Sequence, residues 1–303
     1  MYDIIVVGGG PAGMTAALYA RRNGKSALVI EKAGFGGQIT HSPKVENYPG
    51  TISMSGNEFA DHMLEQILAQ GAEIEFETVT GVSASGDNWA VTTEEGSRFE
   101  AQAVILATGV KHRMLGLPGE TDLVGEGISF CAVCDGDFYT DQKVCMAGGG
   151  NSALQEAILL SDKCAEVIIL QDLPQLTGEE SLQKVLEGRA NVRVLTGVKI
   201  TELLTENGEF SGVGIEQEGV GAQKIACDGL FVAIGLIPEN EAFAELVDLN
   251  EYGYFDTDEQ CVSKTPGIYV AGDCRSKTLR QLTTAVSDGA QAAMNAIRYI
   301  NAR

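Results

Sequence analysis

A strand, a glycine-rich turn and a helix follow one another twice in this chain of 303 residues, and this repeat constrains the fold most. The first copy places Gly8, Gly10 and Gly13 directly after an apolar strand at residues 2–7. The first glycine permits a tight turn, the second lets a pyrophosphate approach the backbone, and the third lets helix pack on strand. Glu31 ends the next strand, 18 residues after Gly13, where a carboxylate can accept hydrogen bonds from a ribose. The pattern predicts a dinucleotide-binding fold.

The second copy starts from an apolar strand at residues 143–147. Gly148 and Gly150 follow in the same spacing, with Ala153 in the third place, and then a helix and a strand at 166–170. The repeat predicts an α/β protein with two Rossmann-like dinucleotide-binding folds.

Apolar strands that end at a glycine recur after each turn and again near the C-terminus, at 104–109, 229–235 and 267–273. A final helix is expected at about 286–301. This order predicts that the second fold is inserted into the first. We expect a first domain of residues 1–114 and 245–303, and a second domain of residues 115–244.

Cys131 and Cys134 lie shortly before the second glycine turn. Two cysteines at this spacing can cycle between a disulfide and a dithiol, so they point to electron transfer next to a bound carrier. The alternative is half of a zinc site, which needs a second pair of ligands, and His41, His62 and His112 are scattered. The remaining cysteines stand singly and are expected to be core thiols: Cys145, Cys164, Cys227, Cys261 and Cys274.

The charge balance excludes two classes of partner. The chain has 42 acidic and 21 basic residues, a formal net charge of -21, which argues against nucleic acid and against an anionic membrane surface. No apolar run reaches the roughly 18 residues that span a bilayer. The N-terminal residues run directly into a strand, so we expect a reducing, cytoplasmic location.

Further short motifs fall in a fixed order, at residues 36–38, 46–50, 107–109, 272–273 and 280–281. Together with the two glycine turns and the Cys131-Ala132-Val133-Cys134-Asp135 segment, this order resembles the low-molecular-weight thioredoxin reductases. The resemblance covers nearly the whole chain. Few families place such a cysteine pair just ahead of a second nucleotide fold.

The resemblance implies FAD in the first domain and a nicotinamide nucleotide site in the second. The implied FAD-binding residues are Gly8, Gly10, Pro11, Ala12, Gly13, Glu31, Gly37, Gln38, Asn47, Thr108, Gly109, Gly272, Asp273, Arg280, Gln281 and Leu282. The second nucleotide would lie at Gly148, Gly150, Asn151, Ser152, Ala153 and Asp172. It also implies a homodimer, a domain that rotates between two orientations, and a thioredoxin-like partner.

The resemblance also assigns roles to the cysteine pair. Cys134 would be the thiol next to the flavin, and Cys131 the thiol that attacks the protein substrate. Asp135 would be the general acid and base for the leaving thiol. Its alternative is a turn residue before Gly136, because Asp-Gly is a common turn.

The donor loop departs from the family. NADPH-using members carry a basic cluster after the second fold's strand, whereas residues 171–177 read Gln-Asp-Leu-Pro-Gln-Leu-Thr and contain no positive charge. Asp172 would repel a 2′-phosphate, so efficient NADPH use is not expected. NADH is one alternative, since Asp172 lies 19 residues after Ala153, where an acid can bind a ribose 2′-hydroxyl. Reduced ferredoxin and NADPH bound outside this loop are the others.

The sequence therefore predicts an FAD-dependent thioredoxin-disulfide reductase with an altered electron donor, NADH or ferredoxin. Two other interpretations stay open. One is a reductase of a different small redox protein or low-molecular-weight disulfide. The other is a flavin-containing redox sensor that does not turn over.

Overall fold

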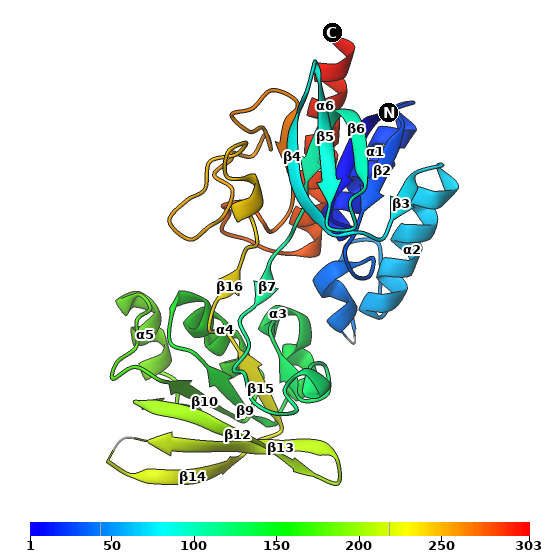
Figure 1. Ribbon diagram of the computed structural model, residues 1–303. Coiled ribbons are helices and arrows are strands. Elements are labelled where there is room, and N and C mark those ends of the chain that lie inside the picture. Colours follow the sequence, from blue (N-terminus) through cyan, green and yellow to red (C-terminus); the bar gives the residue numbers. More distant parts are fainter. Residues whose placement is uncertain (43, 218) are drawn as a thin grey trace. The chain divides into compact units, whose positions relative to one another are not determined.

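The computed structural model describes residues 1–42, 44–217 and 219–303, and the chain forms two compact units (Figure 1). Unit 1 consists of Met1–Lys111 and Ile237–Arg303, and unit 2 of His112–Leu236. The chain passes between them in the short strands β7 (Lys111–His112) and β16 (Leu236–Ile237). Within the described ranges, no helix is long and apolar enough to cross a membrane.

The unit boundaries lie earlier in the sequence than the expected domain boundaries at 114/115 and 244/245. The second shift is the larger, because residues 237–244 pack into unit 1. Asn240 is fully buried there and its amide donates to the carbonyl oxygens of Gly253 and Cys274, at 2.9 Å each. Phe243 joins a core cluster of unit 1. These polar and aromatic contacts carry no periodic signal that would mark the boundary in the sequence.

Unit 1 is built on a sheet of seven strands with the path β3-β2-β1-β6-β5-β4, and β17 pairs with β6. Strands β1, β2, β3, β17 and the C-terminal half of β6 run parallel, whereas β4 and β5 add an antiparallel extension. The strand bounds are β1 Tyr2–Val7, β2 Ala27–Ile30, β3 Glu73–Glu75, β4 Val79–Ser85, β5 Asn88–Thr93, β6 Arg98–Leu106 and β17 Ile268–Val270. Strands β2 and β17 read as continuous apolar runs because both faces are covered, whereas β3 at the edge of the sheet reads Glu-Ile-Glu.

Helices α1 (Pro11–Arg22) and α6 (Leu282–Asn301) pack closely within unit 1. Small residues allow the approach, since a Cβ on Gly289 would lie 2.1 Å from the carbonyl oxygen of Ala12. Helix α6 begins four residues before the expected start, with Gln281 as its N-cap. The remaining helical elements of this unit are η1 Gly37–His41, α2 Gly56–Ala69 and η4 Glu241–Phe243.

Unit 2 holds a parallel sheet with the order β11-β10-β9-β15-β8 and a separate antiparallel sheet β12-β13-β14. The strands are β8 Ile128–Ser129, β9 Lys143–Ala147, β10 Glu166–Gln171, β11 Val192–Thr196, β12 Val198–Glu206, β13 Glu209–Gln217, β14 Gly221–Ala226 and β15 Gly229–Val232. The helical elements are η2 Thr121–Leu123, α3 Ala132–Asp135, η3 Gly136–Tyr139, α4 Asn151–Ser161 and α5 Glu180–Glu187. The prediction of an α/β protein with two Rossmann-like folds is confirmed.

Candidate functional site

The first glycine turn has the geometry that a dinucleotide requires. Gly8 has a φ of 108°, and a Cβ there would lie 2.3 Å from the carbonyl oxygen of Ala107. A Cβ on Gly13 would lie 1.9 Å from the carbonyl oxygen of Gly8, so only glycine allows this helix to meet the strand. Gly10 has open space in front of it. Pro11 opens α1, and no side chain caps its first turn, so Ala12 and its neighbours leave their amides for a ligand.

Glu31 lies directly after β2 and is held in place by two backbone amides. Its Oε2 accepts a hydrogen bond from the Gly9 N–H at 2.7 Å, and its Oε1 accepts one from the Ala33 N–H at 2.9 Å. The carboxylate is therefore anchored to the glycine turn itself. This position next to the turn suits a group that binds the ribose of a dinucleotide.

The fold brings other expected cofactor residues to the same turn. Gly37 begins η1, and a Cβ there would lie 3.5 Å from Cα of Gly10. Gly272 follows β17, and a Cβ there would lie 2.8 Å from Cβ of Ala12. Thr108 and Gly109 follow the C-terminal end of β6, the strand next to β1. The loops after three parallel strands therefore meet at one edge of the sheet, where such folds bind their ligands.

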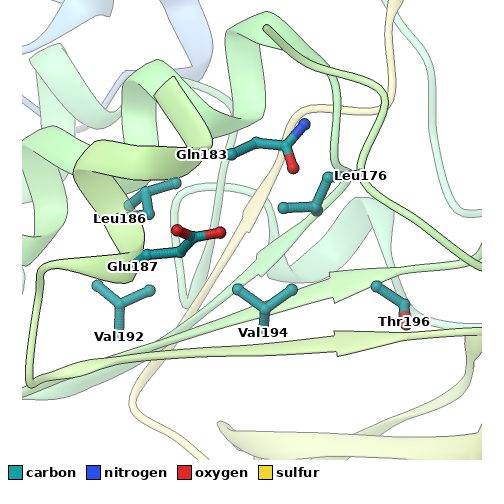
Figure 2. Close-up of a pocket in the computed structure, with 7 residues that line it drawn as sticks. All are labelled: Leu176, Gln183, Leu186, Glu187, Val192, Val194 and Thr196. Atoms are coloured by element: carbon teal, nitrogen blue, oxygen red, sulfur yellow. The ribbon is translucent and has the colours of Figure 1, made fainter. Parts of the chain in front are cut away.

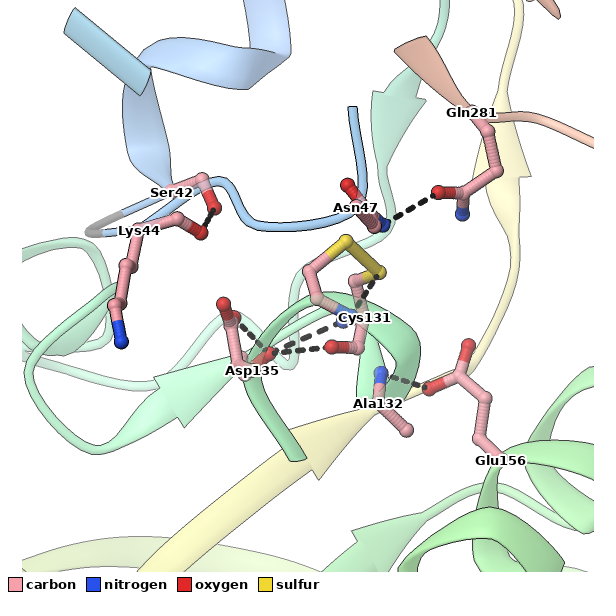
Figure 3. Close-up of a disulfide and its surroundings, with 10 residues drawn as sticks. Ser42, Lys44, Asn47, Cys131, Ala132, Asp135, Glu156 and Gln281 are labelled. Carbon is pink, nitrogen blue, oxygen red and sulfur yellow. Dashed lines mark hydrogen bonds between the residues drawn. A yellow bond between two sulfur atoms is a disulfide. The ribbon is translucent and has the colours of Figure 1, made fainter. Parts of the chain in front are cut away.

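Asn47 and Gln281 are 234 residues apart in the sequence and lie in contact. The Asn47 amide donates to Oε1 of Gln281 at 3.1 Å, as Figure 3 shows. Gln281 caps α6 and precedes Leu282. Gln38 lies in η1 beside Gly37.

Arg280 is engaged by its own loop. Its Nε donates to the carbonyl oxygen of Asp273 at 3.2 Å, and its guanidinium stacks over the Tyr254 ring at 4.3 Å. This residue therefore shapes the loop that carries Asp273.

A buried network of charges supports the same loop, and no motif in the sequence predicts it. Arg275 and Lys277, 2% and 4% exposed, both form ion pairs with Asp288 of α6, at 2.8 and 3.1 Å. Asp288 also accepts from the Gly272 N–H at 3.0 Å. Burial raises the pKa of Asp288, but its bonds to Arg275 and the charge of Lys277 outweigh this and hold it below the usual value. The carboxylate therefore fixes the glycine that approaches α1.

Asp273 follows Gly272 and is half-buried. Burial raises its pKa, and Lys277, with its Nζ 3.3 Å away, opposes that rise. The ion pair is made by its Oδ1, which has no further hydrogen-bond partner among the described residues. Lys277 therefore holds the Asp273 carboxylate in the loop that follows Gly272.

Asn240 is another supporting residue that was not predicted from the sequence. Its Oδ1 accepts a hydrogen bond from Oγ1 of Thr108 at 2.9 Å. It orients one of the expected cofactor residues from a distant part of the chain. The residues of unit 1 therefore fit FAD: a glycine cradle, an uncapped helix start, an anchored Glu31 and the loop of Asp273 surround one edge of the sheet.

Cys131 and Cys134 form a disulfide, with their Cα atoms 5.3 Å apart (Figure 3). Cys131 is the N-cap of α3, a single helical turn, and Cys134 lies within that turn. The Sγ and the carbonyl oxygen of Cys131 both accept from the Cys134 N–H, at 3.2 Å each. The pair is thus built into a short, locally closed turn. The other five cysteines are buried and free, as expected.

Asp135 lies at the end of this turn and is buried. Its Oδ2 accepts from the Ser129 hydroxyl at 2.6 Å, and that hydroxyl also accepts from the Cys131 N–H at 3.1 Å. Burial raises the pKa of Asp135, and the Ser129 bond lowers it in part. Its Oδ1 has no partner within the described residues. A carboxyl group in this setting holds a proton more readily than an exposed one, as an acid and base for thiols requires.

Glu156 of α4 was not expected at the site. Its Oε2 accepts from the Ala132 N–H at 3.2 Å, at the first residue of the redox turn (Figure 3). Burial raises its pKa to about 7, the Ala132 bond lowers it, and the charge of Asp135 raises it. Glu156 lies in an ordinary helical pattern, so the sequence does not predict this contact.

The second glycine turn repeats the geometry of the first. Gly148 has a φ of 120°, and a Cβ there would lie 2.5 Å from the carbonyl oxygen of Ala233. Gly150 precedes α4, which has no side-chain cap at its start. Asn151 opens that helix and pairs with Glu179, while Ser152 is exposed and Ala153 is buried against β9.

The loop after β10 lacks the positive charge that a 2′-phosphate needs. Asp172 is exposed, and in the described part of the chain its side chain forms no hydrogen bond or ion pair. Leu176 of this loop helps to line a pocket of about 280 Å³ (Figure 2). Its lining contains no Lys or Arg and consists of Leu176, Gln183, Leu186, Glu187, Val192, Val194 and Thr196. The turn therefore fits a dinucleotide, and the loop does not fit a 2′-phosphate.

Comparison with known proteins decides the family. The model for the pyridine nucleotide-disulphide oxidoreductases matches residues 2–289. The chain belongs to this family. Thioredoxin reductase of Listeria monocytogenes is 37% identical over 99% of this chain and 94% of its own length. The crystal structure of thioredoxin reductase from Streptococcus pyogenes superimposes with a TM-score of 0.94, at 38% identity, and covers 100% of this chain and 99% of its own.

A third relative carries a different description. The "34.2 kDa protein in rubredoxin operon" of Clostridium pasteurianum is 37% identical over 99% of this chain and 98% of its own length. The resemblance to low-molecular-weight thioredoxin reductases is confirmed, and the chain is a flavoprotein disulfide oxidoreductase of that type. The family implies FAD and a nicotinamide nucleotide as cofactors.

Proposed function

We propose that this enzyme reduces a thioredoxin-like protein through Cys131 and Cys134, and that its electron donor is not NADPH bound in the family's usual mode. The observation that carries the first part is the closed disulfide at a turn that also holds the buried Asp135. The observation that carries the second is the loop after β10, which has no cation.

FAD would be held in unit 1 by the first glycine turn, Glu31 and the loop of Asp273. When bound, FAD supplies the electron pair that reduces the disulfide. Glu31 is fixed by the Gly9 and Ala33 amides to accept from the ribose, and the uncapped start of α1 provides amides for the pyrophosphate.

The reduced pair then acts by thiol–disulfide exchange. The Cys131 thiolate attacks one sulfur of the partner's disulfide, which forms a mixed disulfide and releases the partner's second thiolate. Cys134 next attacks Cys131, which closes the Cys131–Cys134 disulfide and frees the partner as a dithiol. Asp135 gives up and takes back the proton that these leaving thiolates require. Two electrons leave the enzyme and two arrive at the partner.

A donor-independent experiment tests this part. The flavin is photoreduced without oxygen, excess reductant is absent, and oxidised thioredoxin is added. We expect one thioredoxin dithiol per reduced flavin in the wild type and none in Cys131→Ser or Cys134→Ser. Transfer to glutathione disulfide but not to any thioredoxin would instead identify a low-molecular-weight disulfide reductase.

The proposed electron donor rests on a contrast within unit 2, between the second glycine turn and the loop after β10. NADH fits best, because the glycine turn is intact and the exposed Asp172 stands just after β10, where it can accept from a free ribose 2′-hydroxyl. A 2′-phosphate would lose charge-assisted bonds there, each worth roughly 1.5–3 kcal/mol.

A reduced ferredoxin is the second candidate donor. The Clostridium pasteurianum relative is described as a protein in a rubredoxin operon, and this description supports an iron protein as the candidate donor. Titration of the enzyme with NAD⁺ and NADP⁺, followed by flavin fluorescence, separates the candidates. Tighter binding of NAD⁺ supports NADH, binding of neither supports ferredoxin, and tighter binding of NADP⁺ contradicts the proposal.

A further inference from the structure

The amide at the start of the redox turn is satisfied from a different helix. Ala132 is the first residue of α3, where backbone N–H groups have no partner within the helix. Glu156 of α4 accepts from this N–H with Oε2 at 3.2 Å. One peptide bond separates the amide from Cα of Cys131. Through this hydrogen bond, Glu156 therefore holds the turn directly next to Cys131.

Two carboxyl groups are therefore connected to the redox pair through hydrogen bonds. Asp135 reaches Cys131 through the Ser129 hydroxyl, and Glu156 reaches it through the Ala132 amide. Among the described residues of unit 2, no Lys or Arg forms an ion pair with either carboxyl group. A thiolate formed in the reduced pair would add a further negative charge to this group.

The other charged groups around Glu156 are accounted for. Asp135 on α3 raises the pKa of Glu156, after the larger effect of burial. Lys143 of β9 pairs with Glu166 of β10, and Lys184 pairs with Glu180 on α5. The remaining charged side chain of α5 is Glu187, which lines the same pocket as Leu176.

We propose that Glu156 is a positioning residue of the redox pair, which holds the Ala132 amide and whose negative charge opposes thiolate formation at the reduced cysteines. The proposal rests on the disulfide-reductase function and adds a residue to it. Reduction of the disulfide takes up two electrons and two protons, and loss of a thiol proton is then unfavourable while Glu156 is ionised.

The experiment uses the flavin-loaded enzyme with its disulfide reduced by a phosphine, which is then removed without oxygen. Iodoacetamide is added at pH values from 6 to 10, and mass spectrometry follows alkylation of the peptide that contains Cys131 and Cys134. Glu156→Gln keeps an oxygen for the Ala132 amide and removes the charge. Glu180→Gln is the matched control, because it makes the same change on an exposed residue of α5.

At pH 8 we expect alkylation about tenfold faster in Glu156→Gln than in the wild type, which corresponds to a profile displaced by about one pH unit. Glu180→Gln should stay within about twofold of the wild type. Superimposable profiles of Glu156→Gln and wild type would overturn the proposal.

The wild type alone provides a second test that survives any folding defect of the variant. Its alkylation midpoint should lie above the value of about 8.5 that a free cysteine has, and a lower midpoint would contradict the proposal. Neither measurement uses a donor or a thioredoxin. Failure of the proposed donor or partner would therefore leave these profiles unchanged, and the two failures can be told apart.

Discussion

The two glycine turns have a similar backbone conformation but differ in the acidic residue that follows the next strand. Gly8 and Gly148 adopt the same left-handed conformation, and both helices that follow have no side-chain cap. In unit 1 the acid after the strand, Glu31, is anchored by two amides. In unit 2 the acid, Asp172, is exposed and its side chain forms no bond in the described ranges.

The turn and the loop therefore determine different properties of the bound nucleotide. The turn fixes the class of ligand, because its glycines allow a pyrophosphate to approach the amides of a helix start. In the proposed function, the charge of the loop selects among dinucleotides. Changes in each unit should therefore have different consequences.

The largest effect is expected at the first turn. Gly13→Val places carbon atoms where the carbonyl oxygen of Gly8 lies, since even a Cβ would be 1.9 Å from it. We expect loss of more than about nine-tenths of the bound flavin, read from the visible absorption of purified protein. Gly34→Ala, where a Cβ would meet nothing within 4 Å, is the control and should keep its flavin. Normal flavin content in Gly13→Val would show that this turn does not hold FAD.

The next effect is expected at the loop of unit 2. Asp172→Arg exchanges a repulsive charge for an attractive one and should raise kcat/KM for NADPH about tenfold to a hundredfold, as one charge-assisted hydrogen bond would. Asp172→Asn removes only the repulsion and should give a few-fold rise. Equal rates in all three proteins would mean that this loop does not contact the nucleotide.

A smaller change is expected at the acid of unit 1. Glu31→Gln keeps an acceptor for the Gly9 amide but loses a charge, so FAD should bind about tenfold more weakly. Equilibrium dialysis of apoprotein with FAD measures this. Glu75→Gln, an exposed neighbour on β3, should bind FAD as the wild type does. A larger loss in the Glu75 variant would assign the ribose contact elsewhere.

The smallest effect concerns stability and pH. The folded protein binds the Glu156 proton more tightly than the unfolded chain, because its pKa is raised from 4.5 to about 7. The free energy of unfolding therefore falls as pH rises through this interval, and the ionised carboxylate costs roughly 1–3 kcal/mol above it. Calorimetry should find Tm of Glu156→Gln several degrees above the wild type at pH 8 and closer to it at pH 5. A constant difference would show that its pKa is not raised.

Much of the fold could be predicted because its signals are local. The apolar strands, the glycine spacing and the pair Cys131 and Cys134 are each readable within a few residues. The start of the last helix could not be placed, because its N-cap Gln281 is not a common capping residue.

The supporting residues could not be predicted, because their contacts join residues that are not close in the sequence. Asn240 lies 132 residues from Thr108, and Asp288 lies 16 from the Gly272 amide. Glu156 lies 24 residues from the amide that it accepts. Polar residues of this kind give no periodic pattern, and only the packed structure shows which backbone groups they satisfy.

We propose that the second fold binds a dinucleotide at its glycine turn without a preference for NADPH. Anaerobic stopped-flow reduction of the bound flavin tests this proposal directly, with NADPH, NADH and reduced ferredoxin offered in turn. We expect NADH or ferredoxin to bleach the flavin absorption at least about tenfold faster than NADPH at equal concentration. Fastest bleaching by NADPH would contradict the account and would place its 2′-phosphate outside the loop of Asp172.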